Sequence, residues 1–269
     1  GFTVTDGAGN AHNESGNNFV AWCIKAASTA SGATTGAGTA KTYTTQYNPD
    51  LGFAIIKYTG NGTAGHTIPL PTMTDDKAPF FTVHKKTSAA ADWTCWHEGL
   101  SGPTKFLKMS TTESEQTAAT MWNSTAPTSS VITLGTHSNV NANAVTYVVY
   151  VFWASDMCRP IKYTGNGVVD GAFSNLGGSP EWAMFKNASA AQSWILQDRV
   201  RSPNNPITST VYPNLPAVED ATATLDLVSN GLKQRVTNAS HNASGANFIG
   251  IAFVSPEPDS KDGAQLRAK

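Results

Sequence analysis

Charged side chains are scarce in this sequence. They make up 14% of its 269 residues, whereas an average soluble domain carries about 25%. The formal net charge is −1 and no basic run occurs, so the sequence offers little to attract a nucleic acid. Asn, Ser, Thr, Gly and Ala take the place of the missing charges. A neutral surface rich in hydroxyl and amide groups suits contact with other proteins or with sugars.

Long hydrophobic runs are missing too. The longest extends from Tyr147 to Ala154, well short of the about 20 apolar residues that a membrane-spanning helix needs, so we expect no membrane insertion. No signal peptide is visible and the first residue is Gly1, which predicts a processed product, a fragment, or the ordered part of something longer. Apolar residues still make up 40%, enough for real cores, and the length suggests two domains.

Cysteine is equally sparse. Cys23, Cys95 and Cys158 are far apart and odd in number, and no C-x-x-C pair occurs. This spacing argues against a disulfide framework and against a zinc ribbon. We interpret the three residues as buried apolar thiols of a protein assembled in a cytosol.

The motifs of common enzymes are absent. The sequence has no G-x-S-x-G nucleophile elbow and no H-E-x-x-H or comparable ligand spacing. A hydrolase needs two facing carboxylates, and no spacing singles out a pair among Asp75, Asp76, Glu98 and Asp198. We therefore predict a chain that is not an enzyme and that binds no metal or cofactor. One alternative is a metal site where histidines of symmetry-related copies converge along a fibre axis.

One glycine-rich loop formally fits a dinucleotide pattern. Residues 60–65 read G-x-G-x-x-G, but such a site requires the loop to lead into a helix. Pro69 and Pro71 follow instead, and the second occurrence of this loop breaks the spacing. We interpret the loop as the turn of a hairpin.

The sequence that is present repeats itself. Residues 56–62 recur unchanged as residues 161–167, a shift of 105, and residues 85–93 resemble residues 186–194, a shift of 101. Such self-similarity indicates repeated structural units. We predict a first β repeat at 53–155 and a second at 156–254.

The flanking segments complete this division. Residues 12–19 resemble residues 241–248, so we interpret residues 1–25 as the closing hairpin of a truncated repeat. An isolated hairpin is marginal in water, and we expect it to pair with a missing upstream segment, with the next unit, or with another subunit. Residues 26–52 are predicted to be a linker with one strand at 41–46, and residues 255–269 a polar C-terminal tail.

Within each unit, short runs of aromatic and branched residues alternate with turn signals. In the first unit they predict strands at 53–58, 79–85, 92–96, 130–134 and 145–153, the last of them a central strand. Thr112 and Glu115 have the spacing of a capping box, which predicts a short helix at 112–121. The pattern indicates an all-β fold of tandem β-sandwich, jelly-roll-like repeats of about 100 residues.

The repeat also sorts candidate functional residues. Positions shared by both units, such as Trp93 with Trp194 and Tyr58 with Tyr163, are predicted to serve folding. Features of a single unit are freer to bind a ligand. Trp96, His97 and Glu98 form one such cluster, because the second unit has Leu196 at the nearest position and no aromatic residue. The cluster suits a sugar, and its alternative is a buried tryptophan.

A second candidate lies in the second unit. Arg199 and Arg201, together with Asp198, could bind a charged group. The alternative is a structural ion pair beside a loop.

Several strings resemble a repeat domain of tailed-bacteriophage virion proteins, which are often described as tail-fibre or lectin-like and are frequent in marine phages. The most specific string is residues 122–131, and the likeness covers roughly residues 1–254, ending where Ser255-Pro256 departs from the pattern. Further matches are residues 58–62 and 242–245, Asp198, Arg201, Tyr212-Pro213-Asn214 and Ala252-Phe253. The resemblance implies a virion part and names no catalytic residue.

We therefore expect a phage structural protein of a tail fibre or tail tip that contacts the host surface. Its expected partners are other virion proteins, copies of itself in a symmetric homo-oligomer, and a glycan or protein of the host surface. It would be assembled in the host cytoplasm. The alternatives are a capsid decoration or cement protein and a polysaccharide depolymerase.

Overall fold

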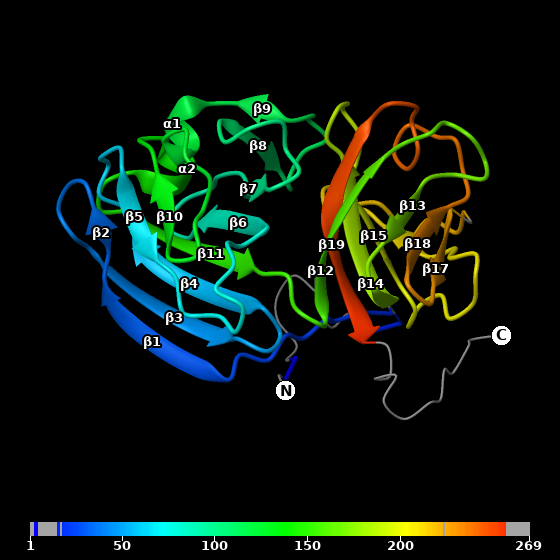
Figure 1. The fold of residues 1–269 in the computed structure, drawn as a ribbon, viewed down its shortest axis with the longest axis horizontal. Coiled ribbons are helices and arrows are strands. Elements are labelled where there is room, and N and C mark those ends of the chain that lie inside the picture. Colours follow the sequence, from blue (N-terminus) through cyan, green and yellow to red (C-terminus); the bar gives the residue numbers. More distant parts are fainter. Residues whose placement is uncertain (1–2, 5–14, 17, 223, 257–269) are drawn as a thin grey trace.

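The structure, a computed structural model, describes residues 3–4, 15–16, 18–222 and 224–256. Strands dominate it, and the two helices are single short turns, so the all-β prediction is confirmed. Figure 1 shows two units side by side, each with one large and one small antiparallel sheet.

The first unit is built around an eight-stranded sheet in the order β1-β3-β4-β11-β6-β7-β8-β9. The small sheet has the order β10-β5-β2. The bounds are β1 Ser28–Ala33, β2 Thr35–Gly36, β3 Thr42–Asn48, β4 Phe53–Thr59, β5 His66–Pro69, β6 Phe81–Lys86, β7 Thr94–His97, β8 Lys105–Lys108, β9 Gln116–Thr117, α1 Ala119–Trp122, β10 Val131–Leu134, α2 Ser138–Asn141 and β11 Thr146–Phe152.

The second unit has a five-stranded sheet in the order β12-β19-β14-β15-β16 and a small sheet in the order β13-β18-β17. The bounds are β12 Cys158–Thr164, β13 Phe173–Asn175, β14 Gly178–Asn187, β15 Ile195–Asp198, β16 Thr210–Val211, β17 Leu225–Val228, β18 Gly231–Gln234 and β19 Asn247–Pro256.

Both units share one arrangement of strands. The row β4-β11-β6-β7 corresponds to β12-β19-β14-β15, and the pair β5–β10 corresponds to β13–β18. The central strand predicted at 145–153 is β11, which pairs with β4 on one side and β6 on the other. Strands that correspond in sequence thus have corresponding neighbours in the sheets of the two units.

Equivalent tyrosines make equivalent contacts in the two cores. Tyr58 stacks on Tyr147 with ring centroids 5.2 Å apart, and its hydroxyl donates to the carbonyl of Val140 over 2.8 Å. Tyr163 stacks on Phe248 at 4.6 Å and donates to the carbonyl of His241 over 2.6 Å. Each core therefore ties its central strands to the loop that precedes the closing strand.

A buried asparagine fixes the loop after the first core strand of each unit. Asn141 Oδ1 accepts a hydrogen bond from the backbone N–H of Asn61, and Asn242 Oδ1 accepts one from Asn166, each over 2.9 Å. Both asparagines are fully buried. Because buried backbone groups must find partners, these side chains determine the path of the glycine-rich loops.

The outer faces of the two large sheets meet and join the units. Phe81 and Phe152 of the first unit face Met184 and Phe253 of the second, and one apolar cluster extends across the contact. Trp194 lies fully buried there and donates its indole N–H to the carbonyl of Lys108 over 3.0 Å. The contact surface is therefore core-like, and Trp194 finds its hydrogen-bond partner in the other unit.

The segment predicted to be a linker is part of the first unit. β1 and β3 pair along their whole length, and β3 pairs with β4, so the linker prediction at 26–52 is wrong. The strand predicted at 41–46 is confirmed as β3. The apolar pattern did not reveal β1 because this strand buries almost nothing.

Three further predictions need correction. The loop at 60–65 is not a hairpin turn, because β4 lies in the large sheet and β5 in the small one. The helix predicted at 112–121 is reduced to α1, and Glu115 bonds instead to Ser101 N–H over 3.1 Å. Cys23 is exposed, although Cys95 and Cys158 are buried as expected.

The predicted terminal segments fall mostly outside the described residues. Of the hairpin predicted at 1–25, residues 3–4, 15–16 and 18–25 are described and carry no strand. Of the tail predicted at 255–269, the first two residues belong to β19, and the remainder lies outside the description.

Candidate functional site

The cluster predicted as a sugar site lies at the contact between the units. Trp96 and His97 are 6% and 1% exposed. His97 Nε2 lies 3.0 Å from the carbonyl oxygen of Gly250 in the second unit, and its Nδ1 accepts from Gly99 N–H over 2.9 Å. Glu98 forms an ion pair with Lys162 at 2.7 Å. The geometry favours the alternative, a buried tryptophan with neighbours that join the two units.

The arginine cluster of the second unit is also committed to internal contacts. Arg199 donates to the backbone carbonyls of Pro180 and Leu227, over 2.9 and 2.5 Å. Arg201 pairs with Asp198 at 2.7 Å and with Glu219 at 2.6 Å. These contacts support the alternative of a structural ion pair.

An open groove exists elsewhere, between the outer faces of the two large sheets. Its main cavity has a volume of about 600 Å³, and a neighbouring hollow of about 450 Å³ shares Trp93 and Met109 with it. The main cavity is lined almost entirely by apolar and aromatic side chains, among them Trp22, Trp93, Tyr150, Phe152, Trp182 and Phe253. Such concave apolar surfaces are the usual sites of small ligands.

Trp93 stands where the two hollows join. It precedes β7, is half-buried, and lies 6.1 Å from the ring of Tyr150. The ammonium of Lys85 lies 5.4 Å from its ring centroid. The equivalent Trp194 is fully buried between the units. One repeat position thus supplies a structural residue in one unit and an accessible aromatic surface in the other.

Ordered polar groups border this aromatic surface. Ser110 donates to Asp92 over 3.1 Å, and Lys108 pairs with Asp92 at 3.4 Å and with Glu113 at 2.9 Å. The hydrogen bond from Lys108 lowers the pKa of Glu113, and the same bond raises the pKa of Lys108. Both groups are therefore charged at neutral pH.

Asn214 completes the rim from the second unit. Its Oδ1 accepts from the backbone N–H of Trp194 over 2.9 Å, and it lines the smaller hollow with Pro213 and Leu215. The same residue thus ties the rim to the contact between the units. An aromatic surface beside fixed hydrogen-bonding groups can stack on a sugar ring and orient its hydroxyl groups.

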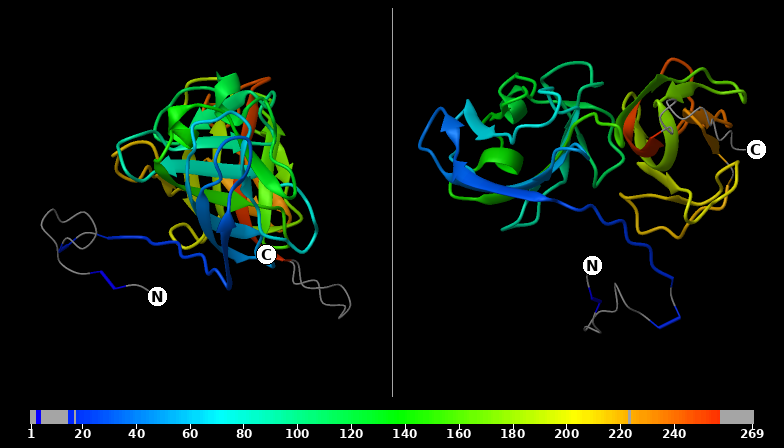
Figure 2. Two further views of the ribbon diagram at one scale, coloured as in Figure 1. Left: turned by 90° about the vertical axis from the view of Figure 1, so that its left-hand side faces the viewer. Right: turned by 60° about the horizontal axis from the view of Figure 1, so that its bottom comes forward.

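A segment of the chain itself lies along the other side of the groove. Residues 21–25 line the main cavity, and Figure 2 shows this part of the chain leaving β1 and passing below the two units. The Trp22 ring lies edge-on to Trp182, with centroids 6.3 Å apart, and is 43% exposed. Aromatic residues of this segment, of the first unit and of the second unit therefore all line the groove.

The residues described around the groove show no arrangement typical of metal binding. Within the described ranges, no three His, Cys, Asp or Glu side chains gather where they could hold a metal ion. Neither of the two helices found in the described part of the chain has the length and apolarity needed to cross a membrane. The groove has a concave shape, an aromatic surface and a polar rim.

Sequence reasoning assigned Trp93 to folding and missed its place in the groove. Its equivalence to Trp194 suggested a shared role, but the contact between the units covers only one of the two. The available signal was position: Trp93 follows the small-residue tip at 87–91, and side chains beside such a tip are close to the surface.

Comparison with known proteins yields one match. A family model described as "Domain of unknown function (DUF7483)" matches residues 1–257. No curated protein and no solved structure matches the chain.

Proposed function

This chain belongs to the DUF7483 family, and we propose that it is a non-enzymatic structural part of a bacteriophage particle that binds a glycan of the host surface. Its place would be a tail fibre or the tail tip. Two lines support the proposal. The strings that resemble phage virion repeats extend over nearly the whole chain, and the repeated β units form a rigid base for a surface groove.

The groove around Trp93 is the observation that carries the proposal. Sugar rings present flat C–H faces that stack on aromatic side chains, while their hydroxyl groups need fixed polar partners. Trp93 and Tyr150 supply the aromatic surface for stacking. The Asp92–Ser110 and Lys108–Glu113 pairs supply the fixed polar partners. A neutral hexose fits this combination, because Ser110 and Asn214 are the polar residues that line the smaller hollow, and the nearby carboxylates of Asp92 and Glu113 are paired with Lys108.

A glycan array probed with the full chain tests the proposal directly. We expect binding to a small set of bacterial surface glycans, followed in solution by a change in tryptophan fluorescence. Trp93→Ala should weaken that binding about tenfold or more, the equivalent of about 1.4 kcal/mol. Because Trp93 is only half-buried, the variant should keep its fold.

Phe173→Ala is the matched control. Phe173 is also an exposed aromatic residue, 42% accessible, but it lies on β13, away from the groove. It should bind like the unchanged protein. Equal losses in both variants, or an array with no bound glycan, would contradict the proposed role of the groove.

The place in the particle needs a separate measurement. Antibodies against this chain should label tail fibres or tail tips in electron micrographs of intact particles. Label over the capsid shell would instead indicate a decoration protein, and release of reducing sugar from host polysaccharide would indicate a depolymerase.

A further inference from the structure

Strand β1 forms an edge of the largest sheet, and no strand in the described part of the chain pairs with its outer side. It pairs with β3 from Ser28↔Tyr47 to Ala33↔Thr42 without a register shift. Alternate residues of an antiparallel strand point their backbone groups to opposite sides. Since Thr34 N–H bonds to the Lys41 carbonyl over 2.7 Å, Ser31 and its next-but-one neighbours point outward. Among the described residues, none bonds to these outward backbone groups.

Nothing in the sequence shields this edge. Between Lys25 and Lys41 there is neither a charged residue nor a proline. Side chains on both faces of β1 are exposed, apart from the half-buried Ser28. Proteins usually block an open edge with charge, proline, a bulge or a covering segment, because bare edges pair with other strands.

The second unit closes the corresponding edges. β12 is the counterpart of β4, and its outer side has no partner strand in the described structure. Pro160 stands there at the position of Ile55 and supplies no N–H. Lys162 follows it with an exposed side chain. Proline and lysine are the usual devices against strand addition.

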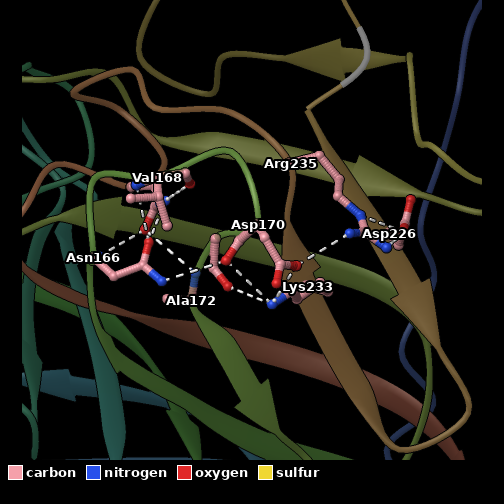
Figure 3. Close-up of polar contacts among 9 residues, drawn as sticks. Asn166, Val168, Asp170, Ala172, Asp226, Lys233 and Arg235 are labelled. Carbon is pink, nitrogen blue, oxygen red and sulfur yellow. Dashed lines mark hydrogen bonds and ion pairs between the residues drawn. The ribbon is translucent and has the colours of Figure 1, made fainter.

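Just before β13 an ammonium group bonds to the outward backbone, and Figure 3 shows Lys233 beside Asp170 there. Lys233 Nζ donates to the carbonyl of Gly171 over 2.7 Å and pairs with Asp170 at 2.9 Å, while Arg235 joins Asp170 at 3.5 Å. In the first unit the corresponding carbonyl, that of Gly65, accepts from Ala37 N–H next to β2 over 2.9 Å. In the second unit the Lys233 side chain thus bonds to the carbonyl that, in the first unit, bonds to the backbone next to β2.

The contrast between the two units points to a use for β1. We infer that the outer edge of β1 pairs antiparallel with β1 of a second copy of this chain, which joins two large sheets across a two-fold axis. The partner is a second copy because β12, the other long edge strand in the described part of the chain, is closed by Pro160 and Lys162, which leaves the edge of β1 itself as the long edge available for pairing. The neutral strand brings no like charges together in that pairing. A two-fold interface of this kind is self-complementary.

Three variants at one position test this inference by sedimentation velocity. The unchanged full chain should form dimers whose fraction grows with concentration. Ser31→Pro removes an outward N–H, a change that an edge strand tolerates, and Ser31→Lys places a charge on the edge. Both should sediment as monomers. Ser31→Ala keeps the backbone donor and should dimerise like the unchanged chain.

Hydrogen exchange adds a readout that a folding defect cannot imitate. The outward amide of Ser31 should become protected as the protein is concentrated, and circular dichroism should show that all three variants are folded. A chain that stays monomeric, or a dimer that both Ser31→Pro and Ser31→Lys leave intact, overturns the inference. Glycan binding by the groove does not depend on this edge, so either proposal can fail without the other.

Discussion

Three buried histidines have side-chain pKa values far below the usual value of a histidine. Burial lowers the pKa of His84 and of His97 to about 3 and that of His241 to about 4. At His97 the hydrogen bond to the Gly250 carbonyl opposes the shift but is outweighed by desolvation. All three side chains are therefore neutral in the folded protein at neutral pH.

The stability of the protein should fall in mild acid. Below about pH 6.5 the unfolded chain binds protons at these histidines while the folded chain does not, so the free energy of unfolding decreases until the pH approaches the folded-state values. Each buried histidine contributes a slope of about 1 kcal/mol per pH unit in that window. His97→Gln should remove one such contribution. Urea unfolding of both proteins at about pH 7 and about pH 5 measures the difference, and equal slopes would contradict it.

The burial of His97 could not be predicted from the sequence around it. Its partner Gly250 is 153 positions away, and the apolar contact that covers it forms only when the two units meet. The comparison of the repeats identified Trp96–His97–Glu98 as a cluster found in the first unit alone. It could not tell that this specificity serves the contact between units rather than a ligand.

Strands with a strong apolar pattern were the easiest elements to predict. β4, β6, β7 and β11 carry aromatic and branched residues toward a core, and all four lie where the sequence placed them. β1 was not predicted, because a strand exposed on both faces needs no aromatic or branched residues. The capping-box spacing at 112–115 was misleading, because Glu115 N–H bonds to the carbonyl of Ala188 in the second unit. A contact with a residue far away in the sequence therefore determined the structure here, and the local capping-box pattern did not.

Strand β2 depends on a glycine. Gly36 has a φ of +77°, and a Cβ there would lie 2.3 Å from the carbonyl oxygen of Gly65. Gly36→Ala should therefore separate β2 from β5 and lower the free energy of unfolding by about 1–3 kcal/mol. Chemical denaturation measures the loss, and hydrogen exchange at Thr67 should report the open edge.

Gly102→Ala is the control for that substitution. A Cβ at Gly102 meets nothing within 4 Å, and the residue is not among those with positive φ. Its stability should stay within about 0.5 kcal/mol of the unchanged protein. Similar losses in both variants would mean that the tight approach of β2 to β5 does not matter.

The two units bury polar groups of each other at their contact. Lys186 of the second unit is fully buried and donates to the carbonyl of Thr112 in the first over 3.0 Å. Asn247 donates to the carbonyl of Gly99 over 2.8 Å, again across the contact. Burial lowers the pKa of Lys186 to about 8. An isolated unit would expose these groups and the apolar faces beside them.

Trp194 is the residue on which this union should depend most. It is fully buried, packs against Phe81 with centroids 6.4 Å apart, and bonds to the backbone of the first unit. Trp194→Ala leaves a cavity at the contact and should cost about 3–5 kcal/mol. Calorimetry should then show two separate unfolding transitions in place of the single one expected of the unchanged chain.

Trp93→Ala provides the matched comparison, since Trp93 holds the same repeat position but is only half-buried and lines the groove. It should lower the unfolding temperature much less and keep a single transition. If both variants lost the same stability, the contact between units would contribute no more than the open groove does. If Trp194→Ala still unfolded in one step, the two sheets would be coupled by the remaining polar contacts rather than by this indole.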